Sequence, residues 1–239
     1  MIETILWGIA VIAPGALVAI ILHEVAHGWA AHALGDPTAK LHGRLSLNPV
    51  RHVDPFGTLA LPLILFAFQM LTIGRIEFLF GWARPVPVDP RHFRRPRQDM
   101  ALVAAAGPAI NFALGFLCAL GFLLLFRFGD PTAGYLVDAL RFAIAVNVLL
   151  MLFNLIPVPP LDGGRILVGI LPREAARRVA RLERAGLALV LLGLFVLPLA
   201  ARELGLRFDP IGAVLLPGLA WVSGLLLALA SLALALIGL

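Results

Sequence analysis

The chain has 239 residues, of which 61% are hydrophobic and 14% charged, and its formal net charge is +5. Soluble globular domains are about 45–50% apolar and about 25% charged, so this composition excludes an ordinary soluble domain and predicts an integral membrane protein. Arginine carries nearly all of the positive charge, which in such a protein indicates loops that face anionic lipid rather than nucleic acid. The single cysteine, Cys118, excludes an intrachain disulfide.

The first apolar segment predicts a helix over about residues 4–32. It follows Met1-Ile2-Glu3, which lacks the positive charge of a signal peptide, so we expect the segment to be retained. Near its end lies His23-Glu24-Val25-Ala26-His27. Histidines four residues apart share one face of a helix and can hold one Zn²⁺, while the glutamate between them can handle a proton. This pattern predicts a metal site at the end of a membrane helix.

The next part of the chain mixes apolar and turn-rich stretches. Residues 56–73 are apolar and barely long enough to span a membrane as a helix. Residues 76–88 contain prolines that forbid a continuous helix and are interpreted as one or two short extended strands. A helix over about 99–126 follows, with alanines at positions 101, 105, 109 and 113. Such a stripe of small residues predicts the close approach of another helix.

The remaining apolar stretches predict a helix over about 133–156 and two further spans over about 185–201 and 211–237. The fold class is therefore expected to be an all-α polytopic membrane protein with five to six transmembrane helices. A re-entrant or β-hairpin element is expected between the first helix and the helix that starts near Asp99. We expect one membrane-embedded domain over residues 1–239, with a catalytic core at about 1–172 and additional C-terminal helices at about 185–239.

A catalytic zinc site normally has three protein ligands, so two histidines leave one ligand missing. Asp162 has the best context, because the prolines and glycines around it predict irregular backbone at the end of an apolar helix. A carboxylate at that depth needs a partner such as a metal, although an Asp-Gly pair can also be a simple turn. The other acids and histidines beside apolar segments are Asp36, His42, His52, Asp54, Glu77 and Asp138.

Three motifs together resemble those of the site-2 proteases, intramembrane zinc metalloproteases, in their short branch without a PDZ domain. The motifs are HEVAH at 23–27, AGPAIN at 106–111 and NLIPVPPLDGGR at 154–165. The resemblance implies that His23, His27 and Asp162 bind one Zn²⁺ and that Glu24 is the general base. It also implies that Asn154 polarises the scissile carbonyl or holds the oxyanion. An inter-helix hydrogen bond is the alternative role for Asn154, and we expect that role for Asn111 and Asn147.

A shared ion would place the ends of the first helix and of the 133–156 helix on one side of the membrane. Residues 34–98 would then begin and end on that side, so the 56–73 segment is expected to be re-entrant, or the 76–88 strands to bring the chain back. The loops on that side hold 15 of the 19 lysines and arginines. The positive-inside rule makes it the cytoplasmic side.

The expected function is hydrolysis of peptide bonds in or near the transmembrane segments of membrane proteins, within the plasma or inner membrane. The expected partners are the bilayer and transmembrane protein or peptide substrates, without nucleic acid. A membrane metal-binding or transport protein and a catalytically inactive relative are the alternatives. The intact Glu24 argues against an inactive relative, and the absence of an internal repeat argues against a transporter. Substrate identity, prior cleavage by another protease and oligomeric state are not specified by the sequence.

Overall fold

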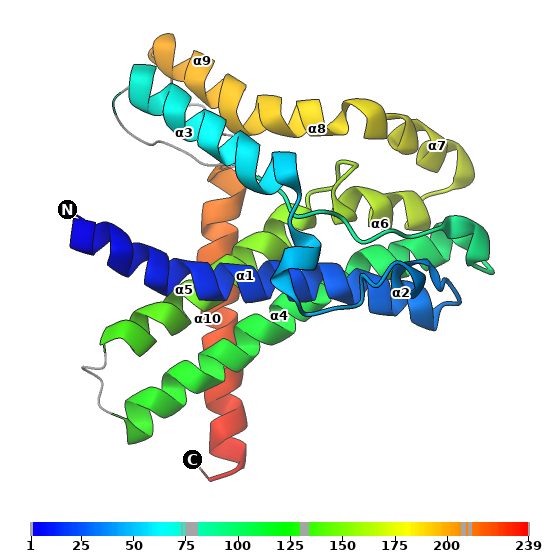
Figure 1. The fold of residues 1–239 in the computed structure, drawn as a ribbon. Helices are drawn as coiled ribbons and strands as arrows, with labels where there is room; N and C mark the ends of the chain where they lie inside the picture. Colours follow the sequence, from blue (N-terminus) through cyan, green and yellow to red (C-terminus); the bar gives the residue numbers. More distant parts are fainter. Residues whose placement is uncertain are drawn as a thin grey trace.

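The computed structural model describes residues 2–72, 74, 81–129, 134–206, 209 and 212–238. In these ranges the regular structure is helical and no strand is formed. The first half contains α1 (Ile2–Ala33), α2 (Thr38–Leu41), η1 (Pro49–His52), η2 (Pro55–Ala60), α3 (Leu61–Thr72), η3 (Pro90–His92) and α4 (Pro96–Phe128). The second half contains α5 (Gly134–Asn154), α6 (Asp162–Ile170), α7 (Arg173–Arg181), α8 (Glu183–Leu191), η4 (Leu192–Val196), α9 (Leu197–Glu203) and α10 (Gly212–Leu236). Figure 1 shows their arrangement.

Five helical segments among the described residues are long and apolar enough to cross a membrane. They are Ala10–Ala33, Pro55–Thr72, Pro96–Phe128, Gly134–Asn154 and Gly212–Leu236. The predicted span over 185–201 is not one of these five, and the structure forms α8, the π-helical stretch η4 and α9 there. The chain is therefore an all-α integral membrane protein, as its composition predicts.

The helical core is built by α1, α4 and α5, and α10 crosses α4 and α5 (Figure 1). Its largest buried cluster joins Ala119 of α4, Ile144, Val148 and Met151 of α5, and Val222, Leu226 and Ala230 of α10. Gly115 makes this crossing close, since a Cβ there would lie 2.9 Å from a methyl group of Leu226. Without a side chain at position 115, the α10 backbone can pack directly on α4.

The predicted row of alanines on α4 is not its most buried face: Ala101 and Ala105 are half-buried. Ala109 and Ala113 are exposed, whereas Gly107, Asn111 and Gly115 are buried at the same spacing of four residues, two positions further along the helix. Glycine allows a nearer approach of backbones than alanine does, so the glycine-containing row faces the neighbouring helices. The four-residue spacing of small residues could be predicted from the sequence. Which of the two rows is buried depends on the side from which the neighbouring helices contact α4.

The expected strands over 76–88 are not found in residues 81–88, and residues 75–80 lie outside the described part of the chain. The backbone of 81–88 belongs to no helix and joins no sheet. Pro85 and Pro87 have no N–H group and cannot donate to a ladder. Two of the other donors bond to separate elements: Arg84 N bonds to the carbonyl of His52 at 2.8 Å, and Val86 N bonds to the side chain of Glu24 at 2.9 Å.

The chain returns to the start of η2 after α3. Trp82 N donates to the Gly57 carbonyl at 3.1 Å, and the Thr58 hydroxyl donates to the Trp82 carbonyl at 2.8 Å. Gly57 is required there, since a Cβ would overlap the Trp82 indole. The residues that enter and leave this excursion are therefore held side by side.

Candidate metal centre

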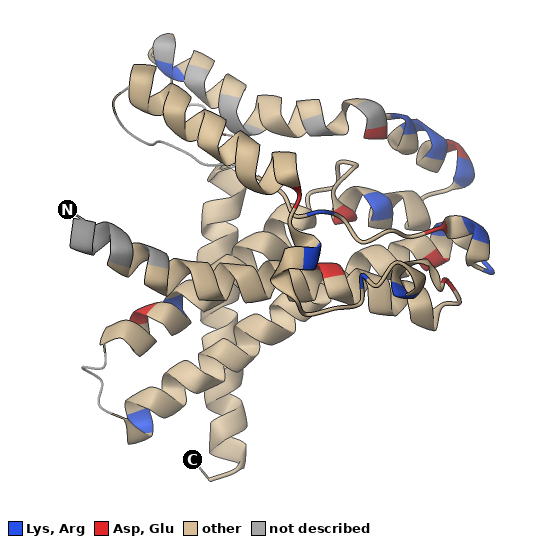
Figure 2. Ribbon diagram, viewed as in Figure 1, with Lys and Arg blue, Asp and Glu red and all other residues tan. Residues whose placement is uncertain are grey.

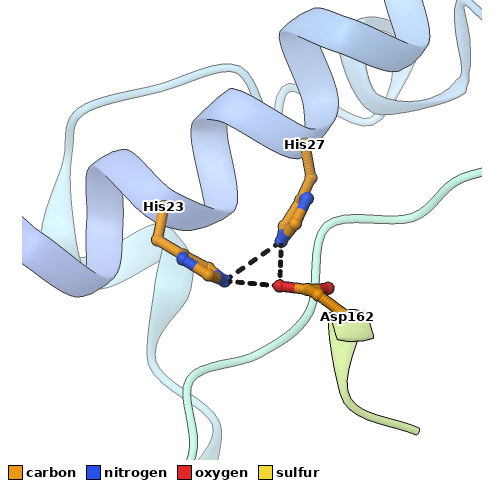
Figure 3. Close-up of side chains that lie close together, drawn as sticks. All are labelled: His23, His27 and Asp162. Carbon is orange, nitrogen blue, oxygen red and sulfur yellow. Dashed lines mark hydrogen bonds and ion pairs between the residues drawn. The ribbon is translucent and has the colours of Figure 1, made fainter. Parts of the chain in front are cut away.

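Two elements far apart in sequence bring three potential ligands together. His23 and His27 project from one face of α1, and Asp162 is the first residue of α6 (Figure 3). The Nε2 atoms of the two histidines are 3.1 Å apart and lie 3.2 and 3.3 Å from Oδ2 of Asp162. Of the described residues, these three form the group that could hold a metal ion. The side chains predicted as ligands thus share one site.

Hydrogen bonds on the far side of each imidazole set its tautomer. Nδ1 of His23 lies 2.6 Å from Oδ1 of Asn111, and Nδ1 of His27 lies 2.8 Å from the Val103 carbonyl. Because both partners are acceptors, each Nδ1 carries the proton and donates it. The unprotonated Nε2 lone pairs are then the ones directed toward Asp162. This is the arrangement by which proteins orient a metal-binding histidine.

The orientation of the Asn111 amide follows from its other contacts. Nδ2 of Asn111 donates to the Ala19 carbonyl at 3.2 Å and to Oδ1 of Asn147 at 2.9 Å. A carbonyl oxygen can only accept, so Oδ1 of Asn111 must be the atom that faces His23. The expected inter-helix hydrogen bonds of Asn111 and Asn147 are therefore confirmed, and they also fix the first histidine.

The three facing atoms fit a cation. Oδ2 of Asp162 is buried and receives no hydrogen bond from the described residues, because both Nε2 atoms that face it are acceptors. Three acceptors in contact are unfavourable unless a cation lies between them. Bonds of 2.0–2.1 Å in tetrahedral geometry put ligand atoms about 3.3 Å apart, close to the separations found here. Two imidazoles and one carboxylate are also a donor set that zinc accepts.

Glycines make room for this cluster. A Cβ on Gly107 of α4 would lie 2.5 Å from Cε1 of His23 and 2.6 Å from Nε2 of His27, so the imidazoles pack directly on the α4 backbone. Gly163 and Gly164 do the same for the loop before α6, since a Cβ on either would overlap the backbone of residues 155–159. These glycines of the AGPAIN and LDGGR stretches therefore let three chain segments meet at the site.

Glu24 is held beside the cluster by a different partner. Its Oε2 accepts a hydrogen bond from Val86 N at 2.9 Å. Prolines on both sides of Val86 leave it as the one donor in the tripeptide 85–87. The carboxylate is thus directed by the extended segment, while the histidines of the same helix turn are directed by α4.

Asn154 is not part of the cluster. It is the last residue of α5, and its Nδ2 donates to the Leu150 carbonyl of the same helix at 2.9 Å. The other candidate ligands also lie elsewhere. Asp36 is buried and bonds to Thr38, Asp89 and His92. Asp54 caps η2, and His42 and His52 bond to backbone carbonyls. Asp138 is exposed, and Glu77 lies outside the described residues.

Sequence reasoning missed the second set of contacts around the site. It did not assign Asn111 or the Val103 carbonyl as partners of the histidines, nor Gly107 as the surface on which they pack. The sequence feature that could have indicated these contacts is Asn111, which follows Gly107 by four residues in an otherwise apolar helix. An amide in such a position requires partners, and a neighbouring helix that carries histidines supplies them.

Comparison with known proteins agrees with this geometry. The model of Peptidase family M50 matches residues 129–197, which include Asp162. YwhC of Bacillus subtilis, named as a zinc metalloprotease, is 40% identical over 192 residues, which are 79% of this chain and 81% of YwhC. Rip2 of Mycolicibacterium smegmatis, also named as a zinc metalloprotease, is 32% identical over 176 residues, 74% of this chain and 63% of Rip2.

Rip3 of Mycobacterium tuberculosis is 35% identical over 124 residues, 50% of this chain and 30% of its own length. No solved structure matches significantly. The similarity to YwhC extends over most of both proteins, and the described helices supply a histidine and aspartate group suited to zinc. The chain therefore belongs to peptidase family M50, the site-2 protease family of zinc metalloproteases.

Proposed function

We propose that this protein is an intramembrane zinc metalloprotease that hydrolyses peptide bonds in or near the transmembrane segments of other membrane proteins. The observation that carries the proposal is the meeting of His23, His27 and Asp162 at the inner face of an apolar helix, with Glu24 one residue from the first histidine. Substrates that reach such a site are membrane-embedded proteins or peptides, since the site lies on a candidate membrane span.

In this proposal His23, His27 and Asp162 hold the metal and Glu24 is the general base. When bound, Zn²⁺ would polarise the scissile carbonyl and lower the pKa of a water molecule toward about 7. Glu24 takes the proton from the attacking water and later delivers it to the leaving amine. The Val86 N–H keeps one carboxylate oxygen engaged at 2.9 Å, which leaves the other oxygen for the proton.

A role for Asn154 in holding the developing oxyanion is the remaining part of the proposal. In the structure its Nδ2 is used by the Leu150 carbonyl, one turn back on α5. Serving the oxyanion would require the amide to leave this bond when substrate is present. Removal of one oxyanion donor typically lowers kcat about 10²–10³-fold, whereas loss of a hydrogen bond within one helix does not.

We also propose that the site opens toward the cytoplasm and that the apolar segment expected at 56–73, of which the structure describes Pro55–Thr72, is re-entrant and not a full crossing. Figure 2 places lysine and arginine mainly around α2, α6, α7 and the start of α4, near the end of α1 that carries the histidines. The positive-inside rule assigns such a side to the cytoplasm. The paired contacts between Trp82 and residues 57–58 support the return.

The test uses the purified full chain in detergent or vesicles with a membrane-peptide substrate. We expect one zinc per chain, cleavage that stops with a chelator and recovers with Zn²⁺, and loss of cleavage in Glu24→Gln with zinc retained. Glu174→Gln, an exposed site on α7, is the matched control and should cleave normally. Cleavage by Glu24→Gln at the normal rate would refute the proposal. Metal movement across vesicles without any proteolysis would instead favour the transport alternative.

A further inference from the structure

A cavity lies beside two segments that support the candidate metal centre. It has a volume of about 540 Å³ and lies between the 85–90 segment, the start of α4, α6 and the α7–α8 junction. Cavities of about 300–1,000 Å³ are the usual size for ligand sites. Its lining includes Val86, whose N–H bonds to Glu24, and Pro159, three residues before Asp162. The cavity therefore begins where the proposed catalytic residues are anchored and extends away from them.

The cavity combines apolar walls with two guanidinium groups. Prolines, valines and Met100 form most of the walls, and Arg97 of α4 and Arg165 of α6 supply the positive charge. Nη1 of Arg97 is buried and has no hydrogen-bond partner among the residues that the structure describes. A buried guanidinium nitrogen without an acceptor is unfavourable, so a side-chain movement of Arg97 that brings Nη1 to an acceptor in the cavity would be favourable.

The second arginine has a partner that is easily exchanged. Arg165 lies 3.7 Å from Glu183 at the cavity rim, and the two side chains are 44% and 55% exposed. A separation of this size between exposed groups makes a weak ion pair. A carboxylate on a ligand could therefore displace Glu183 and meet Arg97 and Arg165 together, and arginine suits carboxylates because its planar fork can donate two parallel hydrogen bonds.

We propose that this cavity binds a carboxylate of the polypeptide substrate, a few residues from the scissile bond, and so sets substrate preference. The inference rests on the proposed protease function. The carboxylate belongs either to an acidic side chain or to a chain end. The cavity walls are apolar and offer few backbone donors, so the two guanidinium groups are the donors that an incoming carboxylate would meet. Pro85, Pro87 and Pro90 have no N–H, and Asp89 N is already bonded to Asp36 at 2.7 Å.

A peptide fits the position of the cavity better than a lipid does. A bound lipid would fill the space next to Val86 and Pro159 and separate substrate from Glu24 and Asp162. A peptide that runs from the metal centre into the cavity would pass Val86 and Pro159 on its way. The same carboxylate site would then be used once per turnover and emptied with the product.

The experiment measures cleavage of matched membrane peptides by the zinc-loaded full chain. A single Asp or Asn is scanned through the residues flanking the cleaved bond, and the C-terminus is a free acid or an amide, which separates the two carboxylate sources. We expect kcat/KM at one position or end to favour the acid by about tenfold to a hundredfold. Arg97→Gln and Arg165→Gln should each reduce this ratio toward one, whereas Glu183→Gln should raise it. Arg94→Gln, an exposed neighbour outside the cavity, should leave it unchanged.

Peptide binding to the Glu24→Gln variant, followed by fluorescence anisotropy, repeats the comparison without hydrolysis. If the wild-type chain cleaves no peptide, the protease function fails while this binding ratio still tests the cavity. Equal use of acid and amide at every position, or a preference that survives in Arg97→Gln and Arg165→Gln, overturns the inference. A change limited to retention on phosphatidylglycerol vesicles would assign the cavity to lipid and also overturn it. Should Arg97→Gln fail to fold, Glu183→Gln and the scan of the wild-type chain decide.

Discussion

The backbone N–H of Val86 donates to Oε2 of Glu24 at 2.9 Å, across 62 positions of sequence. The orientation of the Glu24 carboxylate, the proposed general base, therefore depends on the 81–88 segment and not only on α1, the helix to which Glu24 belongs. The histidines of the same helix turn depend on α4 instead. Metal binding and proton transfer are therefore supported by different parts of the fold and can be damaged separately.

Val86→Pro should remove the donor to Glu24 and keep the flanking Pro-X-Pro backbone extended. Loss of a hydrogen bond to a charged group is worth about 1.5–3 kcal/mol, so we expect kcat to fall about tenfold or more, with zinc content unchanged. Val86→Ala keeps the N–H and is the control for lost side-chain packing. Steady-state cleavage with metal analysis separates the two, and equal rates in both variants would contradict the assigned role of the N–H.

Asn111→Leu should weaken metal binding through His23. The variant removes the acceptor that holds Nδ1 of His23 at 2.6 Å, and loss of such an outer partner typically lowers metal affinity about 10–100-fold. Asn48→Leu, in an exposed loop, should leave the affinity unchanged. Competition with a chelator of known affinity measures the effect. Wild-type affinity in Asn111→Leu would show that His23 is oriented without the amide.

Gly107→Ala should displace both imidazoles, since its Cβ would lie 2.5–2.6 Å from their atoms. Overpacking of this kind costs about 1–3 kcal/mol, which here falls on the bound geometry and predicts an about 5- to 150-fold loss of zinc affinity. Gly121→Ala on the same helix is the matched control, because its Cβ would meet only Leu140 methyl groups at 3.6 Å or more. Similar zinc affinities in the two variants would disprove the packing argument.

Asp36 should make stability depend on acid pH. Burial alone would raise the pKa of this carboxyl, but hydrogen bonds from Thr38, Asp89 and His92 lower it below its usual value. The unfolded chain then binds the proton more readily, so this stabilisation is complete above the unfolded pKa and is lost as pH falls through the lower folded value. We expect Tm to fall more steeply below about pH 4 in the wild type than in Asp36→Asn.

The same variant tests the size of this effect. At neutral pH, Asp36→Asn should lose about 1–3 kcal/mol because the charged acceptor of several hydrogen bonds is gone. Asp138→Asn, at an exposed position of α5, should follow the wild-type curve at every pH. Parallel pH curves for wild type and Asp36→Asn would show that Asp36 is not the responsible group. Thermal unfolding in detergent, followed by circular dichroism, provides the measurement.

The membrane class, the apolar segments of the five candidate spans and the HEVAH helix could be predicted because each depends on local composition and spacing. Asp162 could be selected as third ligand because its surroundings forbid a regular helix and a carboxylate there needs a partner. The partners of the histidines could not be assigned, since hydrogen bonds of Asn111 and Val103 depend on how α4 is rotated against α1. The strand prediction for 81–88 was wrong because an extended backbone became paired with side chains and single carbonyls rather than with a neighbouring strand.

The contact between Trp82 and Gly57 has a consequence for the way this chain can change over evolution. The residues between these two positions leave from and return to one fixed point. Because both ends of this stretch are held at that point, a change in the sequence between them need not shift the residues on either side. The register of Val86 against Glu24 would not move. The stretch between Gly57 and Trp82 can therefore be replaced without loss of the candidate metal centre.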